Sequence, residues 1–230
     1  MTFADLVDRY IGLSFRKQLA LADFLGKHSF QVSLSKGTVD FGKGPGLFGK
    51  RRVYPIQVLG TEAEDSGTWL WAWANEASHI PAGLLEAVGR VRSYGEAKGV
   101  AELTTAQLPS REYPGHLLSL VASGIAGADA YYRGPYLGGA AFFLVGGTPL
   151  AQPVPTPQER IARVLMEVIS NFDVQHRAMA RSYLKAEGFR LDEDGSVLSA
   201  AGPAGQSLRI EFDDQGRIAN VNALIRGDNR

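Results

Sequence analysis

The sequence predicts an α+β fold, in which helices pack on an antiparallel sheet and a smaller segment of one helix and hairpins follows. Three observations support this class. A helical hydrophobic pattern opens the chain, alternating strand patterns with short links come next, and a second long helix precedes further short strands. A segment rich in proline, residues 148–156, divides the 230 residues into predicted domains 1–147 and 157–230.

The first predicted element is a helix. Thr2 can cap its start and Gly26 fits its end, because glycine readily ends a helix. Apolar residues recur at helical spacing from Phe3 onward. This pattern stops at Gly26, where a different period begins.

Four strands are predicted next, because apolar residues then alternate with polar ones. They cover residues 30–34, 39–41, 53–60 and 68–74. Consecutive strands of this kind favour an antiparallel meander. The rest of the first domain is predicted to contain helices over about residues 81–98 and 113–126, and strands over 130–136 and 140–145.

The second domain is predicted to open with a single long helix over about residues 156–187, which Gly188 ends. Turn residues at 194–195 and 214–216 then separate short strands. The predicted order is therefore one helix followed by antiparallel hairpins.

Composition excludes several classes of protein. Lysine and arginine number 24, as do aspartate and glutamate, so no basic excess points to nucleic acid or an anionic membrane. The chain has no cysteine, which excludes disulfides and thiolate chemistry. Its densest apolar run in a long uncharged stretch, residues 140–145, is a strand length and far too short for a membrane helix. The start lacks the basic and apolar pattern of a signal peptide, so we expect a soluble cytoplasmic protein.

A glycine-rich loop at residues 44–50 has the glycine and lysine spacing of a phosphate-binding loop. That motif requires serine or threonine next and then a helix, whereas here Arg51 and a strand follow. We interpret the loop as a hairpin connection. The alternative is a modest anion site formed by Lys43, Lys50, Arg51 and Arg52.

The four histidines, His28, His79, His116 and His176, show no metal-binding spacing. No nucleophile motif is present either, so the sequence predicts neither a cofactor nor a metal. An enzyme remains an alternative, because a fold can bring an acid and a base together. The pairs considered are His116 with Glu76 and His116 with Asp129.

The distinctive motif is Trp-Leu-Trp-Ala-Trp-Ala-Asn at residues 69–75, which holds all three tryptophans of the chain. On a strand, alternating positions direct all three indoles to one face. That face is either core beneath the helices or the floor of an aromatic cleft. The predicted ligand-binding residues for a cleft are Trp69, Trp71, Trp73, Asn75, Glu76, His79, His116, Tyr131 and Tyr132.

Together with residues 56–60 and 92–96, this motif resembles an uncharacterised bacterial family, a domain of unknown function, over about residues 3–145. The resemblance implies a bacterial and cytoplasmic protein. It implies no activity and no catalytic residue.

Three hypotheses of function follow. The first is a non-catalytic module that binds a partner protein or small ligand through an aromatic face. The second is a hydrolase or lyase with a spatially assembled site of histidine and carboxylate. The third is a structural or assembly subunit, for instance a homodimer that docks through its second segment. The sequence favours a non-catalytic protein without excluding an enzyme.

Overall fold

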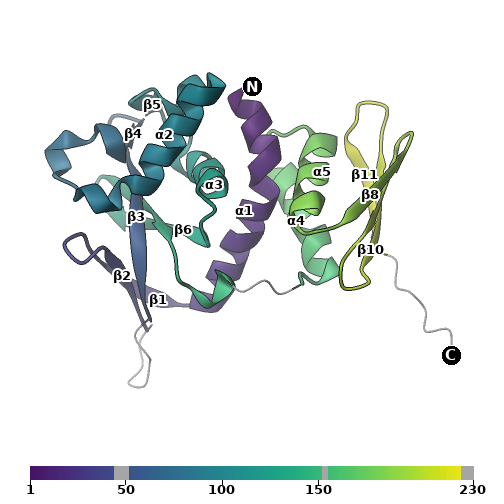
Figure 1. Ribbon diagram of the computed structural model, residues 1–230, viewed down its shortest axis with the longest axis horizontal. Helices are drawn as coiled ribbons and strands as arrows, with labels where there is room; N and C mark the ends of the chain where they lie inside the picture. The colour runs from purple at the N-terminus through teal and green to yellow at the C-terminus, as the bar shows by residue number, and fades with distance from the viewer. Residues whose placement is uncertain (44–51, 152–154, 224–230) are drawn as a thin grey trace. The chain divides into compact units, whose positions relative to one another are not determined.

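The computed structural model describes residues 1–43, 52–151 and 155–223 (Figure 1). In these ranges the chain forms five α-helices, several short 3₁₀ helices and two antiparallel sheets of seven and four strands. The α+β class predicted from the sequence is therefore confirmed. Every helix in the described ranges is too short or too polar to cross a membrane.

The chain divides into two compact units, which are described separately. Unit 1 comprises Met1–Phe3 and Lys17–Gln152, and unit 2 comprises Ala4–Arg16 and Pro153–Arg230. The first helix, α1 (Phe3–Leu25), therefore contributes residues to both units. Two domains that are each continuous in sequence cannot describe two units that both contain part of α1.

The sheet of unit 1 has a meander at its centre, as the strand patterns predicted. Strands β1 to β5 follow one another in order, and β7 pairs with both β3 and β6. The seven strands are β1 (His28–Ser33), β2 (Thr38–Lys43), β3 (Arg52–Ala63), β4 (Thr68–Trp71), β5 (Gln107–Pro109), β6 (Ala130–Tyr136) and β7 (Gly139–Val145). The long strand β3 joins the parts, because its first residues pair with β2 and its later ones with β4 and β7.

Two helices of unit 1 position the candidate site. Helix α2 (Glu86–Lys98) and helix α3 (Gly115–Ala126) pack on β3 and on each other. Gly127 ends α3 in the left-handed conformation, with φ of 67°. This turn leads directly into β6, so the end of α3 lies beside the sheet.

The helix prediction for unit 2 is wrong. The single helix predicted over residues 156–187 is two helices, α4 (Gln158–Asn171) and α5 (His176–Ala186). Phe172 between them is extended, and the backbone N–H of Gln175 donates to the Asp8 carboxylate at 2.9 Å. The segment between the two helices thus contacts distant α1, and a hydrophobic period cannot reveal this contact.

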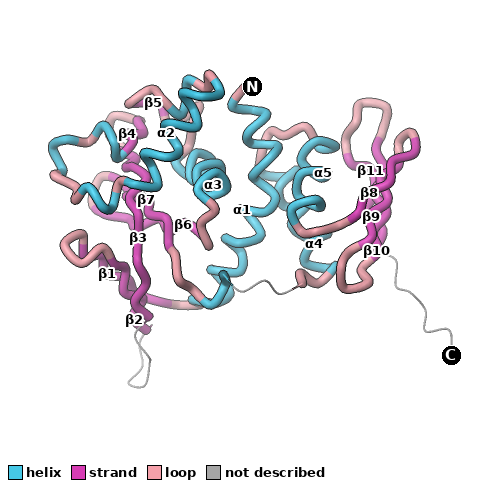
Figure 2. The backbone as a smooth tube through the Cα atoms, viewed as in Figure 1, coloured by secondary structure: helices cyan, strands magenta, loops and turns pink. Residues whose placement is uncertain are grey.

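The four strands of unit 2 form a sheet in the order β11-β10-β9-β8 (Figure 2). They are β8 (Arg190–Asp194), β9 (Val197–Ala201), β10 (Ser207–Phe212) and β11 (Ile218–Ala223). Apolar side chains of β9 and β10 are buried together with those of α4 and α5.

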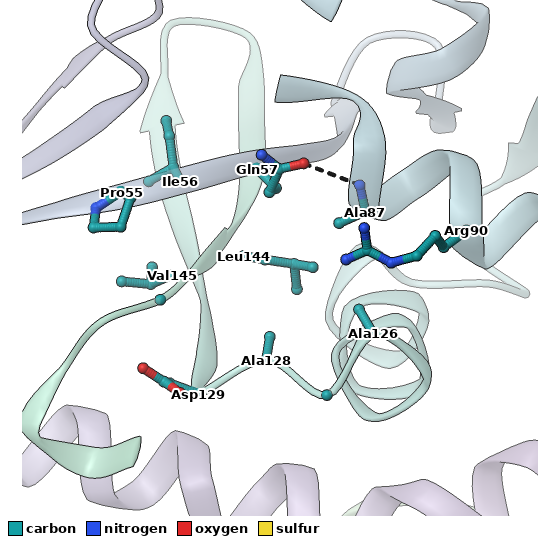
Figure 3. A pocket seen from close by; sticks show the side chains of 12 residues that line it. Pro55, Ile56, Gln57, Ala87, Arg90, Ala126, Ala128, Asp129, Leu144 and Val145 are labelled. Atoms are coloured by element: carbon teal, nitrogen blue, oxygen red, sulfur yellow. Dashed lines mark hydrogen bonds between the residues drawn. The ribbon is translucent and has the colours of Figure 1, made fainter. Parts of the chain in front are cut away.

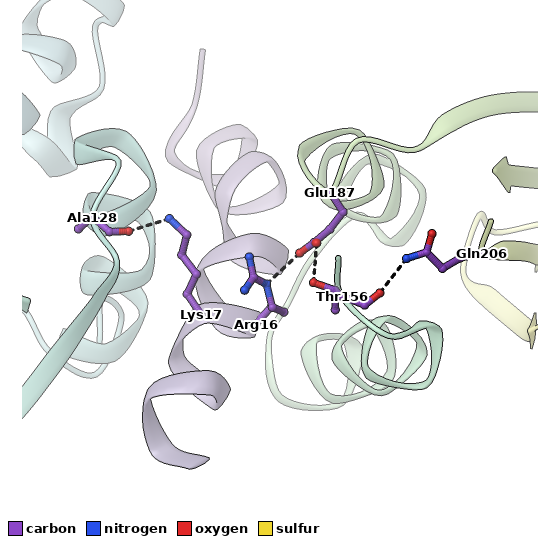
Figure 4. Close-up of polar contacts among 6 residues, drawn as sticks. All are labelled: Arg16, Lys17, Ala128, Thr156, Glu187 and Gln206. Carbon is purple, nitrogen blue, oxygen red and sulfur yellow. Dashed lines mark hydrogen bonds and ion pairs between the residues drawn. The ribbon is translucent and has the colours of Figure 1, made fainter. Parts of the chain in front are cut away.

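A polar network secures α1 within unit 2 (Figure 4). The carboxylate of Glu187 pairs with Arg16 at 2.9 Å and accepts a hydrogen bond from the Thr156 hydroxyl at 2.7 Å. The side-chain amide of Gln206 donates to the Thr156 carbonyl at 3.1 Å. Since the Glu187 side chain is only 7% exposed, this pair satisfies a buried charge.

Candidate functional site

The tryptophan motif does not form one continuous face. Trp69 and Trp71 lie on β4 and are fully buried, with their rings edge to face at 5.2 Å. The strand ends at Trp71, and a 3₁₀ turn over Ala72–Ala74 takes Trp73 away from the alternating pattern. The prediction of three indoles on one strand face is therefore wrong. The two strand indoles belong to the core, and no surface of either is accessible to a ligand in this structure.

The remaining predicted residues near the motif lie on short turns. Trp73 is half-buried beneath the guanidinium of Arg92, 4.4 Å from its ring centroid. Asn75 accepts a hydrogen bond from the backbone of the next turn, which holds Glu76 and His79 at the surface. His79 has a φ of 45°, unusual for a residue other than glycine. These groups form a surface turn rather than the wall of a described pocket.

The two tyrosines predicted as a second aromatic wall point to opposite faces of β6, as neighbours on a strand must. The Tyr131 hydroxyl lies 2.7 Å from Nδ1 of His116. Tyr132 instead packs edge to face on Phe41 at 4.8 Å, and its hydroxyl lies 3.1 Å from Nε2 of His28. The structure thus unites His116 with Tyr131 and places Tyr132 elsewhere.

His116 does not form the acid–base pairs considered from the sequence. Among the described residues, no hydrogen bond or ion pair joins it to Glu76 or Asp129. Burial lowers the pKa of His116, the positive charge of Arg133 lowers it further, and the carboxylate of Glu62 opposes both. Burial also raises the pKa of Tyr131 strongly, so its hydroxyl keeps its proton.

A pocket of about 260 Å³ lies in unit 1 between the sheet and the two helices (Figure 3). Strands β3 and β7 form its floor, and the first turns of α2 and the end of α3 form its sides. The lining residues are Pro55, Ile56, Gln57, Ala87, Arg90, Ala126, Gly127, Ala128, Asp129, Leu144, Val145 and Gly146.

Gln57, on β3, bonds the chain at the start of α2. Its amide donates to the Gly83 carbonyl at 2.8 Å and accepts from the backbone N–H of Ala87 at 2.9 Å. This pair of bonds fixes the start of α2 relative to β3. Because Ala87 and Ala126, on the two facing helices, carry only methyl side chains, space remains above the apolar floor.

The pocket carries one charge of each sign. The guanidinium of Arg90, on α2, forms no hydrogen bond or ion pair with any described residue. Asp129 accepts two bonds from Thr148 through Oδ2, at 2.9 Å from the backbone nitrogen and 3.1 Å from the hydroxyl. No described cation pairs with Asp129, and Lys17 nearby donates to the Ala128 carbonyl instead.

Sequence reasoning named Asp129 only as an acid–base candidate and did not identify Gln57 or Arg90. No pattern could have done so, because the lining comes from separate elements and its residue types are ordinary. The glycine-rich loop at residues 44–50 lies outside the described residues, as do Lys50 and Arg51 of the anion-site alternative. In the described ranges, histidines and carboxylates nowhere gather in a group of three that could hold a metal ion.

Comparison with known proteins identifies a family for most of unit 1 and for the part of α1 that belongs to unit 2. Residues 4–148 match the model described as "Family of unknown function (DUF6882)". No curated protein and no solved structure matches the chain.

Proposed function

The chain belongs to the DUF6882 family, whose function is unknown, and we propose that it is a non-catalytic module that binds a small ligand in the Gln57–Arg90–Asp129 pocket. The observation that carries this proposal is a pair of opposite charges beside an apolar floor, Arg90 and Asp129, neither of which forms an ion pair with a described residue. Binding sites combine apolar walls with a few oriented polar groups in this way. Asp129 is half-buried and Arg90 is exposed, so a ligand of opposite sign gains most at the carboxylate, which is partly removed from water.

The size of the pocket favours a small ligand. Pockets that hold drug-sized molecules measure roughly 300 to 1,000 Å³, and this one lies just below that range. Ile56, Leu144 and Val145 on its floor are almost fully buried, so the floor is supported by the core of the sheet. The site is therefore built on rigid elements and can hold a ligand without first being ordered.

The lining supports binding rather than catalysis. Among the twelve lining residues are one guanidinium, one carboxylate and one amide, with no histidine, serine or tyrosine. Oδ2 of Asp129 accepts two hydrogen bonds from Thr148. The side-chain amide of Gln57 donates to one backbone carbonyl and accepts from one backbone N–H. No nucleophile lies beside a base here.

The test fills the pocket and leaves the fold intact. Ala126 lies half-buried in the last turn of α3 and faces the pocket (Figure 3), so Ala126→Leu places a larger side chain in it. The matched control is Ala97→Leu, the same substitution at an exposed position on α2. A metabolite library is screened by thermal shift, since a ligand at a hundred times its Kd stabilises by about 2.7 kcal/mol.

We expect a hit that the control variant retains and Ala126→Leu loses. A hit that both variants bind equally well places the ligand outside this pocket and refutes the proposal. The same conclusion follows if the library gives no hit.

A second candidate function is that of a hydrolase or lyase that acts on a small polar substrate at His116. The supporting observation is the 2.7 Å contact between His116 Nδ1 and the Tyr131 hydroxyl, which orients the imidazole. His116→Gln would abolish turnover of a substrate from a hydrolase panel, whereas His79→Gln, at an exposed turn, would retain it. Absence of any turnover by the native protein rules this candidate out.

A further inference from the structure

The two charges of the pocket lie on opposite sides of it. Figure 3 shows Arg90 on α2 at one side and Asp129, in the turn after α3, at the other, with Leu144 between them. They form no ion pair with each other, although each lacks an oppositely charged partner among the described residues. The apolar floor thus separates a positive end of the pocket from a negative end.

The negative end is the Asp129 carboxylate itself. Figure 3 shows Ala126, in the last turn of α3, on the Arg90 side of the pocket, and Asp129 farther along the turn that leads into β6. Oδ2 of Asp129 is held by Thr148, and this leaves Oδ1 to accept from a ligand.

We infer that the ligand is a zwitterion whose ammonium and carboxylate ends are separated by a short apolar segment. This inference rests on the proposed function of the pocket. The carboxylate would pair with the Arg90 guanidinium, whose planar shape suits two parallel hydrogen bonds. The ammonium would lie at Asp129, and the apolar segment would cover Leu144 and its neighbours.

Ligands with a single charge suit the pocket less well. An anion that pairs with Arg90 leaves Asp129 without a counter-charge, and its apolar tail would cover that carboxylate. A cation that pairs with Asp129 leaves Arg90 in the same position. Only a ligand with both charges satisfies both ends at once.

Three probes of similar length separate these cases. They are 6-aminohexanoate, hexanoate and hexylamine, and each is titrated into the full chain by calorimetry. We expect 6-aminohexanoate to bind at least about tenfold more tightly than hexanoate or hexylamine, because each of those two probes can form a charged hydrogen bond at only one end of the pocket. Equal binding of hexanoate and 6-aminohexanoate would show an anion site and overturn the inference.

The variant Arg90→Gln tests the orientation. It should weaken 6-aminohexanoate binding by about tenfold and leave hexylamine binding unchanged. The matched control is Arg111→Gln, which removes an exposed arginine that does not line the pocket. If the control weakens binding as much as Arg90→Gln, the effect is one of overall charge and the inference fails.

Free ω-amino acids and short peptides share this chemistry, and glycyl-leucine distinguishes them. Tighter binding of the dipeptide than of 6-aminohexanoate identifies a peptide, and weaker binding identifies an ω-amino acid. If none of these zwitterions binds while a library ligand sensitive to Ala126→Leu does, the inference is wrong and the proposed function stands. If the library also gives no such ligand, both fail.

Discussion

Trp69 and Trp71 are equally buried, but their indole N–H groups differ. The Trp71 N–H donates to the Glu102 carbonyl at 3.0 Å. The Trp69 N–H is buried and finds no acceptor among the described residues. Replacing each residue in turn by phenylalanine removes the same atoms from neighbouring positions of one strand, so the comparison isolates the hydrogen bond.

The expected difference follows from the state of each N–H. The loss of apolar contact and the cavity left behind are similar for the two changes and largely cancel. Trp71→Phe also removes a hydrogen bond and leaves the Glu102 carbonyl without its donor, which costs about 1–3 kcal/mol. Trp69→Phe removes a buried donor that has no partner, which offsets part of its cost. We therefore expect Trp71→Phe to be the less stable variant by about 2 kcal/mol.

Urea denaturation followed by tryptophan emission measures this difference. All three tryptophans belong to unit 1, so the signal reports the unfolding of that unit, and each variant retains two of them. Linear extrapolation gives the free energy of unfolding of each variant in water. Equal stabilities, or a lower stability for Trp69→Phe, would contradict the assignment of the two N–H groups.

Three further predictions concern stability. Glu187→Gln should lower the unfolding free energy by about 1–3 kcal/mol in thermal denaturation, because it removes the buried partner of Arg16. Burial raises the pKa of Asp8, so the folded state binds a proton more tightly than the unfolded state, and stability falls as pH rises through the range above 3.8. Asp8→Asn should therefore be more stable than the native protein near pH 7, with the gap closing near pH 3, and a gap independent of pH would contradict this. Gly89→Ala should stabilise α2 by about 0.5–1 kcal/mol, because nothing lies within 4 Å of the added methyl. Gly115→Ala should destabilise by about 1–3 kcal/mol, because its methyl would lie 2.6 Å from an aromatic ring of β7; if calorimetry gives both changes the same sign, the packing argument is wrong.

Most elements of the fold could be predicted from local patterns. The first helix, the β1–β4 meander and the final hairpins each follow from a hydrophobic period that their own residues display. Where a local element depends on a distant contact, the pattern misleads. The apolar residues around Phe172 follow a helical period, yet the backbone at Phe172 is extended. Three residues later, the backbone N–H of Gln175 donates to Asp8 on α1.

The end of β4 shows the same limit. Alternation of indoles continues through Trp73, but the chain turns after Trp71, and Trp73 stacks beneath Arg92 of α2. The alternating pattern holds for Trp69 and Trp71, which share one buried face of β4, and it fails at Trp73, which lies beyond the end of the strand. Trp73 contacts a helix beside the strand, and a period of two contains no information about that helix.

The candidate pocket could not be predicted because the residues that line it form no recognisable sequence motif. A core strand needs large residues in register, and such residues stand out in a sequence. A pocket needs small residues such as Ala87 and Ala126 around a space, and its charges, Arg90 and Asp129, form no ion pair with a described residue. These residues are common and lie far apart in the chain, so only the fold brings them together. The tryptophan motif therefore specifies the sheet on which the pocket is built, and the chemistry of binding must be sought in residues that the motif does not contain.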